Sequence, residues 1–317
     1  MRNLSLRQLR AVLAAHRLGK INLVAREIGL SPSAVTLQIQ QAEAAAGAIL
    51  FDRTSEGLRA TDSGHVFVAA AQAIEQRLAM LRDELALIQG VGGGTLRLGA
   101  VSTAKYFVPL LMAGFLADYP GVDIRLTVGN RAAMVSALHD QEIDIVLMGR
   151  PPRTMPVSTY LIGEHPLVII APPDHPLASL TQISKRSIAE EHFLVREPGS
   201  GTRMSLELFL GDIPGRLDSI GAEFGSNETI KQAVMAGLGI AFISAHTIAL
   251  EVSLGRLVIL DVLGTPVRRH WFTVSRADRT FSSAMTAFNA FVRQRGVEFL
   301  PVVQRIARQQ TPAPADR

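Results

Sequence analysis

The chain has 317 residues, of which 48% are hydrophobic, 19% are charged and none is cysteine. This length suggests about two domains with full cores, and the composition excludes disulfides, thiolate metal sites and a cysteine nucleophile. The sequence contains neither a signal peptide nor the run of about 18 apolar residues that a membrane span needs, so the cytoplasm is the expected compartment.

The net charge of +4 is concentrated near the N-terminus. Residues 1–60 hold eight Lys or Arg and four Asp or Glu, a net charge of +4, so the rest of the chain is neutral on balance. A basic module attached to a neutral body is expected of a nucleic-acid binder. The alternative is a charged face that serves only solubility.

Three helices are predicted in the first fifty residues. The spacing of apolar residues predicts helices over 7–17 and 23–28. Gly29 permits the turn that follows, and Ser31 is a favoured cap for a third helix with Pro32 at its first position.

The second and third helices are predicted to pack as a helix-turn-helix over residues 21–40. Val35 and Ile39 are expected to bury against Leu23 and Ile28. A generic pair of packed helices is the alternative interpretation.

The segment ILFDRTSEGLRA predicts two short strands joined by a turn at residues 55–57. Leu50 and Phe51 are expected to anchor the first strand in the core. Arg53 and Arg59 flank the turn, where they can reach phosphates or a minor groove. The pattern therefore predicts a wing that contacts DNA.

The third helix, PSAVTLQIQQA, carries no positive charge. Its exposed side chains are therefore expected to contact bases through hydroxyl, amide and apolar groups, while arginines elsewhere bind the backbone. The predicted DNA-contacting residues are Ser31, Pro32, Ser33, Thr36, Leu37, Gln40, Arg53 and Arg59.

At this point the sequence resembles the LysR-type transcriptional regulators. In that family the helix-turn-helix runs into Leu-Phe-x-Arg and then into a wing that ends in Leu-Thr-x-x-Gly. The corresponding segments here are LFDR at 50–53 and LRATDSG at 58–64. Leu37 departs from the family, whose members often carry arginine or another long side chain there, so the resemblance does not indicate which bases are contacted.

A long helix is predicted after the wing, because residues 62–89 contain no proline. Apolar residues recur at intervals of four and three, which is typical of a two-stranded coiled coil. They are Phe67, Ala71, Ile74, Leu78, Leu81, Leu85 and Ile88. A rod of roughly 40 Å would pair two protomers and separate their DNA-binding domains. The alternative is one amphipathic helix packed on its own domain.

The body of the chain, residues 95–301, alternates predicted strands and helices, which indicates an α/β architecture with parallel strands. Ligands of such sheets bind beyond the carboxyl ends of the strands, where helices begin. The strand ends here carry hydroxyls, amides, glycines and arginines, including a Gly-Ser-Gly turn with a Thr cap at residues 199–202. Such donors favour one cleft that accepts anions.

The predicted effector-binding residues share this location and chemistry. They are Ser102, Thr103, Asn130, Arg150, Glu197, Ser200, Thr202, Arg203 and Asn227. Glu197 is the one acid near the predicted cleft, where it would orient Arg203 or a ligand hydroxyl rather than perform acid–base chemistry.

The resemblance to LysR-type regulators extends over the body, and it implies two α/β subdomains like those of periplasmic binding proteins. The strings STAKYF, LTVGN, MGRPP, APPDHPLA, REPGSGTR and GSNETIKQAVMAGLGIAFIS resemble the subgroup that activates carbon dioxide fixation (Calvin cycle) operons. For that subgroup the resemblance implies an anionic effector, namely a sugar phosphate such as ribulose bisphosphate, phosphoenolpyruvate, NADPH or ATP, and no obligatory cofactor.

The resulting domain organisation has four parts. They are a winged helix-turn-helix domain at 1–61, a dimerising linker helix at 62–90, an effector domain at 91–301 and a disordered tail at 302–317. Within the effector domain, subdomain I is expected at 91–165 and 268–301, and subdomain II at 166–267, with a glycine-rich hinge at 91–94 ahead of them.

The sequence does not indicate an enzyme. The hydrolase pattern Gly-x-Ser-x-Gly is missing around Ser200, and the eight histidines show no metal-binding spacing. The expected partners are double-stranded promoter DNA, a small anionic metabolite, a second copy of the chain in a homodimer or homotetramer, and RNA polymerase. The alternatives are a LysR-type regulator of another pathway that senses a carboxylate, and a small-molecule-binding α/β protein without a DNA function.

Overall fold

The computed structural model describes residues 4–55, 57–88, 93–213 and 222–302. The chain divides into two compact units, Met1–Ile88 and Gln89–Arg317. Residue 56, which belongs to the predicted wing turn, lies outside the described residues. Residues 91 and 92, half of the glycine-rich hinge, and all but the first residue of the predicted tail also lie outside the described residues.

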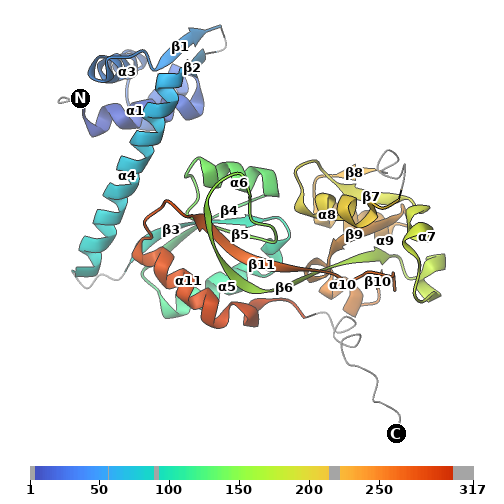
Figure 1. Cartoon of the computed structure of the whole chain (residues 1–317). Coiled ribbons are helices and arrows are strands. Elements are labelled where there is room, and N and C mark those ends of the chain that lie inside the picture. The colour runs from blue at the N-terminus through green and yellow to red at the C-terminus, as the bar shows by residue number, and fades with distance from the viewer. Residues whose placement is uncertain (1–3, 56, 89–92, 214–221, 303–317) are drawn as a thin grey trace. The chain divides into compact units, whose positions relative to one another are not determined.

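Unit 1 contains three helices, a two-stranded wing and a long helix (Figure 1). Their bounds are α1 Leu6–Leu18, α2 Ile21–Ile28, α3 Pro32–Ala46, β1 Phe51–Thr54, β2 Gly57–Ala60 and α4 Asp62–Ile88. Gly29 ends α2 in the left-handed conformation at φ 67°, and the Ser31 hydroxyl accepts a hydrogen bond from the Ala34 amide at 3.2 Å. The predicted helix-turn-helix and its cap are confirmed.

One predicted core contact of this domain is wrong. Val35 and Ile39 are buried as expected, but Leu23 is 43% exposed. Because α2 begins at Ile21, the helical period turns Val24 and Ala25 toward the core and leaves Leu23 on the outer face.

The apolar residues of the predicted coiled-coil seam in α4 differ in how far they are buried. Phe67 and Ala71 are buried in the core of unit 1, against α1 and the wing, so the predicted seam does not begin at its first two positions. Ile74 and Leu81 are 41% and 46% exposed. The side chains of Leu85 and Ile88 lie outside the described part of the chain.

Unit 2 consists of two lobes on one sheet, whose strand order is β4-β3-β5-β11-β6-β9-β7-β8, with β10 paired to β6 (Figure 1). Lobe 1 holds β3 Gly94–Val101, η1 Ala104–Tyr106, α5 Val108–Asp118, β4 Val122–Gly129, α6 Arg131–His139, β5 Ile145–Met148, α11 Ser283–Arg295 and η5 Gly296–Phe299. Lobe 2 holds η2 Pro176–Ser179, α7 Lys185–Ala189, β7 Phe193–Arg196, α8 Gly201–Leu210, β8 Glu223–Phe224, α9 Asn227–Met235, β9 Ile240–Ser244, η4 Ala245–Thr247, α10 Ala249–Ser253 and β10 Val258–Ile259.

Two long antiparallel strands connect the lobes, β6 Val157–Ala171 and β11 Val267–Arg276. β6 pairs with β11 as far as Leu167 and with β9 from there on. The prediction of parallel strands therefore holds inside each lobe, where β3 lies between β4 and β5, and β7 between β8 and β9. It is wrong for β6 and β11, because a chain that passes from one lobe to the other and returns must run in opposite directions.

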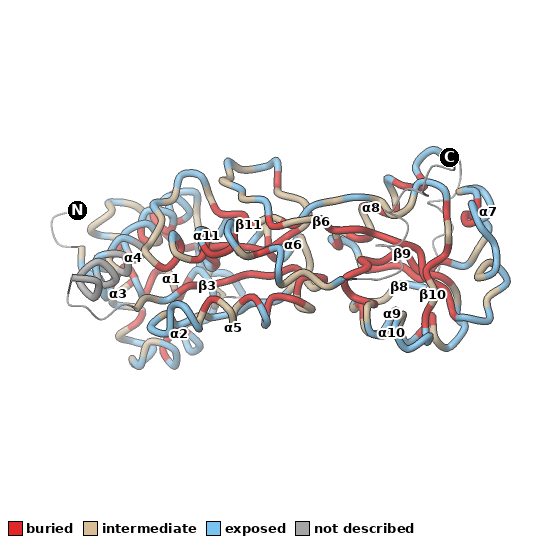
Figure 2. Tube along the Cα trace, turned by 90° about the horizontal axis from the view of Figure 1, so that it is seen from below, coloured by how far each residue is buried: buried red, intermediate tan, exposed pale blue. Residues whose placement is uncertain are grey.

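Each lobe has a core of its own, visible as buried stretches of strand in both lobes (Figure 2). In lobe 1, Phe107, Phe115, Phe288 and Trp271 pack with the strands. In lobe 2, two clusters cover opposite faces of the sheet, one around Phe242 and one around Ile243. Since the cores are separate, the space between the lobes is free to be polar. Within the described residues, no helix has the length and apolar character to cross a membrane.

Candidate functional site

A cleft lies between the lobes, at the carboxyl ends of β3, β4 and β5 and the start of α8. It is lined by Val101, Ser102, Thr103, Asn130, Arg131, Met148, Gly149, Arg150, His165, Leu167, Ser200, Gly201, Thr202, Ser205 and Arg269. The lining residues come from both lobes and from the two connecting strands. The cleft is therefore complete only when the lobes lie in this arrangement.

The first turn of α8 presents hydroxyls to the cleft. Ser200 is its N-cap and accepts a hydrogen bond from the Thr202 amide at 3.3 Å, so the cap is serine rather than the predicted threonine. Thr202 and Ser205 are both buried and line the cleft from the same face of the helix. A helix start with free donors attracts negative charge, because its N–H groups and its dipole point at the ligand.

Three arginines line the cleft, and none of the described residues that line it is acidic. Burial, together with the charge of Arg150, lowers the pKa of Arg131, whose Nε donates to the Arg150 carbonyl at 3.1 Å. Arg150 Nη1 and Arg269 Nε are buried and have no hydrogen-bond partner within the described chain. Buried guanidinium N–H groups without partners are costly, and an anion would supply the missing acceptors.

The rings of His165, Trp271 and His246 stack on one another, and His165 is the member of this stack that lines the cleft. The ring of His165 lies 3.9 Å from that of Trp271 at an interplanar angle of 20°. Trp271 Nε1 in turn donates to His246 Nδ1 at 3.0 Å. Burial, and then the charges of His246 and Arg269, lower the pKa of His165 well below its usual value. The imidazole that lines the cleft is therefore neutral at neutral pH.

Six of the nine predicted effector-binding residues meet in this cleft. They are Ser102, Thr103, Asn130, Arg150, Ser200 and Thr202. Asn130 also caps α6, since its Oδ1 accepts from the Ala133 amide at 2.9 Å. The structure therefore places these six predicted residues in one cleft. Their contact with a ligand stays a prediction.

The other three, Glu197, Arg203 and Asn227, lie outside the cleft lining. Arg203 donates to Glu223 at 2.7 Å and to Glu207 at 3.1 Å, so Glu197 does not orient it as predicted. The reason is the helical period: Arg203 shares a face of α8 with Glu207, four residues later, whereas Thr202 and Ser205 share the face toward the cleft.

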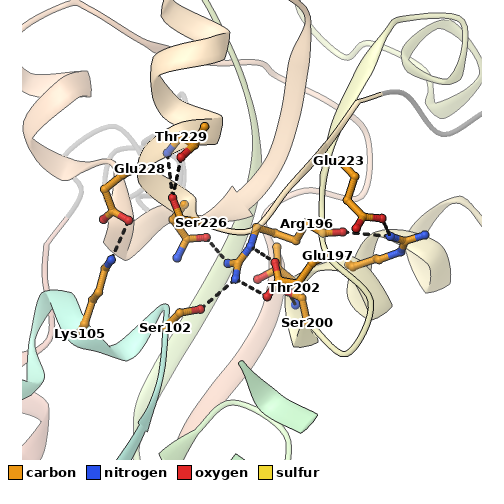
Figure 3. Close-up of polar contacts among 12 residues, drawn as sticks. Ser102, Lys105, Arg196, Glu197, Ser200, Thr202, Glu223, Ser226, Glu228 and Thr229 are labelled. Atoms are coloured by element: carbon orange, nitrogen blue, oxygen red, sulfur yellow. Dashed lines mark hydrogen bonds and ion pairs between the residues drawn. The ribbon is translucent and has the colours of Figure 1, made fainter. Parts of the chain in front are cut away.

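Glu197 and Asn227 are instead engaged by Arg196, a residue that the sequence analysis did not select (Figure 3). The buried Arg196 guanidinium makes two hydrogen bonds to Glu197, at 2.7 and 2.9 Å, and one to Asn227 at 2.5 Å. A fourth, at 3.1 Å, reaches Ser102 in lobe 1. Arg196 thus joins the end of β7 to the end of β3 next to the cleft.

His165, Ser205 and Arg269 also line the cleft, although none of them was predicted from the sequence. Arg131 lies at one of the predicted strand ends but was not among the predicted effector-binding residues. Ser205 was one helical turn beyond Thr202. His165 and Arg269 come from the middle and the start of the strands that join the lobes, and no local pattern marks such positions as a binding site.

The predicted DNA-contacting residues form two surface groups in unit 1. Ser31, Pro32, Ser33, Leu37 and Gln40 are exposed on or beside α3, and Arg53 and Arg59 are exposed on the wing. Thr36 is half-buried, and its hydroxyl donates to the Pro32 carbonyl at 3.0 Å. Ser31 is partly occupied as the helix cap.

Within the described residues, no group of three or more His, Asp or Glu side chains is placed to hold a metal ion.

Comparison with known proteins agrees with this two-unit organisation. Residues 6–65 match the model of the bacterial regulatory helix-turn-helix protein, lysR family, and residues 89–296 match the LysR substrate binding domain. The HTH-type transcriptional regulator CbbR of Sinorhizobium medicae is 58% identical over 305 residues, which cover 96% of this chain and 97% of the relative. The RuBisCO operon transcriptional regulator of Allochromatium vinosum is 42% identical over 290 residues, which cover 92% and 96%.

Among solved structures, the regulatory domain of Synechocystis CcmR in complex with 2-PG is similar to unit 2. The TM-score is 0.59 and the identity is 33%, over 64% of this chain and 96% of that one.

Proposed function

Because the chain belongs to the LysR family of helix-turn-helix transcriptional regulators, we propose that it controls carbon dioxide fixation operons in response to a phosphorylated metabolite bound between the lobes. The similar protein of Allochromatium vinosum is named as the regulator of a RuBisCO operon, and the more similar CbbR is named as an HTH-type transcriptional regulator. In this proposal unit 1 binds promoter DNA, and the state of the cleft in unit 2 alters that binding or its consequence for transcription.

The single observation that carries the effector proposal is the unbalanced positive charge of the cleft. Arg131, Arg150 and Arg269 line it without an acidic residue among the described lining, and two of their nitrogens are buried without partners. Arginine and a helix N-terminus together bind phosphate through charge-assisted hydrogen bonds. The effector class is therefore a phosphorylated or nucleotide metabolite, with ribulose bisphosphate, phosphoenolpyruvate, NADPH and ATP as candidates.

The alternative is a regulator that senses a carboxylate, because arginine also pairs with carboxylates. A cleft with three guanidinium groups favours a ligand of two or more negative charges over a monocarboxylate. The complex of the similar CcmR domain with 2-PG supports the phosphorylated class.

The protein is also proposed to act as a homodimer. The exposed Ile74 and Leu81 lie on one seam of α4, where a second α4 would cover them. Paired protomers place two DNA-binding domains on one site, and a closing cleft can shift the balance between two arrangements of the dimer.

Titration calorimetry on the full chain tests the effector proposal. Sugar phosphates, phosphoenolpyruvate, NADPH, ATP and 2-phosphoglycolate should bind, with succinate and benzoate as carboxylate comparisons. Arg150→Gln should weaken phosphate binding by about 10- to 100-fold, since a charged hydrogen bond contributes about 1.5–3 kcal/mol. Arg203→Gln is the matched control, because Arg203 lies outside the cleft lining.

The result that would reject the proposal is equal weakening by Arg150→Gln and Arg203→Gln, or binding of the carboxylates alone. Transcription from a carbon fixation promoter in a strain that carries only Arg150→Gln tests the biological role. It should lose its response to the metabolite while promoter binding persists.

A further inference from the structure

The buried imidazole of His165 also lines the cleft, and being neutral it adds nothing to the positive charge of the three arginines. Both of its ring nitrogens are buried and without a hydrogen-bond partner among the described residues. A neutral imidazole has one N–H donor and one acceptor nitrogen, so two hydrogen bonds are missing at this point. Leaving buried polar groups unpaired is costly, and such groups in a binding cleft indicate what the ligand provides.

The ring has little freedom to find partners elsewhere. It is stacked on Trp271 at 3.9 Å, and Trp271 is held by its own hydrogen bond to His246. On another side the ring meets Gly149, where a Cβ would lie 2.6 Å from His165 Nδ1. A side chain at position 149 would therefore displace the imidazole, which gives the glycine a role in the shape of the cleft.

The acceptor nitrogen of the ring selects a particular ligand chemistry. Oxygen atoms of a fully ionised phosphate or carboxylate accept hydrogen bonds but donate none, and the nearby arginines donate only. Such oxygen atoms can accept from the arginines and from the imidazole N–H, but they leave the acceptor nitrogen without a donor. A ligand hydroxyl both donates and accepts, so it would supply that donor. Burial and the charge of Arg269 keep the ring neutral, so its acceptor nitrogen is available.

We propose that His165 is a specificity-determining residue that hydrogen-bonds a hydroxyl of the effector, so that the cleft selects hydroxylated phosphates over phosphates that lack a hydroxyl. This inference rests on the proposed function, since it assumes that the cleft binds a phosphorylated metabolite. It narrows the effector to sugar phosphates, hydroxy acids that keep a free hydroxyl beside the phosphate, and nucleotides. It disfavours phosphoenolpyruvate and 2-phosphoglycolate, which belong to the phosphorylated class but have no free hydroxyl.

The test compares two compounds that differ by one hydroxyl, D-3-phosphoglycerate and 3-phosphonooxypropanoate, by titration calorimetry on the full chain. The wild-type protein should bind the hydroxylated compound about tenfold or more tightly, because a site matched to a hydroxyl rejects the analogue without it. His165→Phe should bind the two compounds within about twofold of each other. His165→Gln, which keeps a donor and an acceptor, should retain part of the preference.

Two further variants separate a direct contact from damage to the ring stack. Gly149→Ala keeps the imidazole but displaces it, so it should lose the preference as His165→Phe does. His246→Gln alters the stack from outside the cleft lining and should keep the preference. Promoter binding by each variant reports that the chain is folded.

The outcomes distinguish this inference from the function on which it rests. Equal binding of both compounds by the wild-type protein, or an unchanged preference in His165→Phe, overturns the role of His165 and leaves the phosphate cleft standing. The same loss in His246→Gln as in His165→Phe also overturns it. Binding of neither compound, nor of any phosphate, to the wild-type chain overturns both.

Discussion

Lys105 of lobe 1 and Glu228 of lobe 2 form an ion pair between the lobes, with Nζ and Oε2 2.6 Å apart (Figure 3). The Tyr106 hydroxyl donates to the same carboxylate, and the ammonium of Lys231 lies 4.8 Å from the Tyr106 ring centre. Burial alone would raise the pKa of Glu228, but hydrogen bonds from Lys105 and Tyr106 lower it to about 2. The Glu228 carboxylate therefore stays ionised across the physiological pH range.

Replacing either residue of this ion pair is expected to weaken effector binding, although neither side chain lines the cleft. Because both side chains are partly exposed, solvent screening limits the contribution of the pair to about 1 kcal/mol or less. Glu228→Gln should then raise the effector dissociation constant by about two- to fivefold, as the arrangement of lobes that completes the cleft becomes less populated.

A double-mutant cycle with Lys105→Met, followed by calorimetry and urea unfolding, measures the coupling of the pair. Asp123→Asn is the matched control, since Asp123 pairs with Arg125 within one strand of lobe 1 and bridges nothing. If Glu228→Gln and Asp123→Asn had the same effector affinity, the bridge would have no role in binding.

Unfolding of the effector domain should become easier as the pH falls from 7 to 5. Burial lowers the pKa of His246 to about 4, and it also lowers the pKa of His165 well below its usual value. The unfolded state, with an ordinary histidine pKa near 6.5, then binds more protons than the folded state between pH 6.5 and 4, so stability falls as the pH decreases. For His246 alone the loss at pH 5 is about 2 kcal/mol.

Urea unfolding of the full chain at several pH values, followed by tryptophan fluorescence of Trp271, measures this loss. His246→Gln should remove part of the slope between pH 7 and 5, whereas replacement of the exposed His139 by Gln should leave it unchanged. A slope identical in wild type and His246→Gln would contradict the assignment.

The two groups of predicted DNA contacts should respond differently to substitution. Arg53→Gln should weaken binding to all duplexes alike and reduce the slope of log affinity against log salt by about one, since an arginine–phosphate contact displaces a counterion. Gln40→Ala should change the preference among promoter sequences by about 1–3 kcal/mol with the slope unchanged. Mobility shifts across salt concentrations separate the two, and identical behaviour of both variants would refute the division.

Self-association should depend on the exposed seam of α4. Replacing Leu81 by Asp places a charge in the proposed interface and should raise the dimer dissociation constant by at least about tenfold, which corresponds to 1.4 kcal/mol. Val66→Asp is the control, because Val66 is also exposed on α4 but lies outside the heptad positions. Sedimentation equilibrium compares them, and an unchanged constant for Leu81→Asp would place the interface elsewhere.

The elements of unit 1 were predictable because short-range chemistry specifies them. Gly29 in the left-handed region, Ser31 as a cap and Pro32 at the first helical position each depend on the backbone within a few residues. The prediction for Leu23 was wrong because the residue at which α2 begins decides whether Leu23 or Val24 faces the core. That start is set by packing against α1 and α3.

The sequence alone is enough to predict the chemistry of the cleft. The alternation of strands and helices places the strand ends, which are rich in hydroxyls and arginines, at one edge of the sheet. Tertiary structure alone decided which side chains face inward. The rotation of about 100° per helical residue turns Thr202 into the cleft and Arg203 out to Glu223. The pairing of β6 with β11 brings His165 opposite Arg269, although they are far apart in the chain, and no local pattern can encode that neighbourhood.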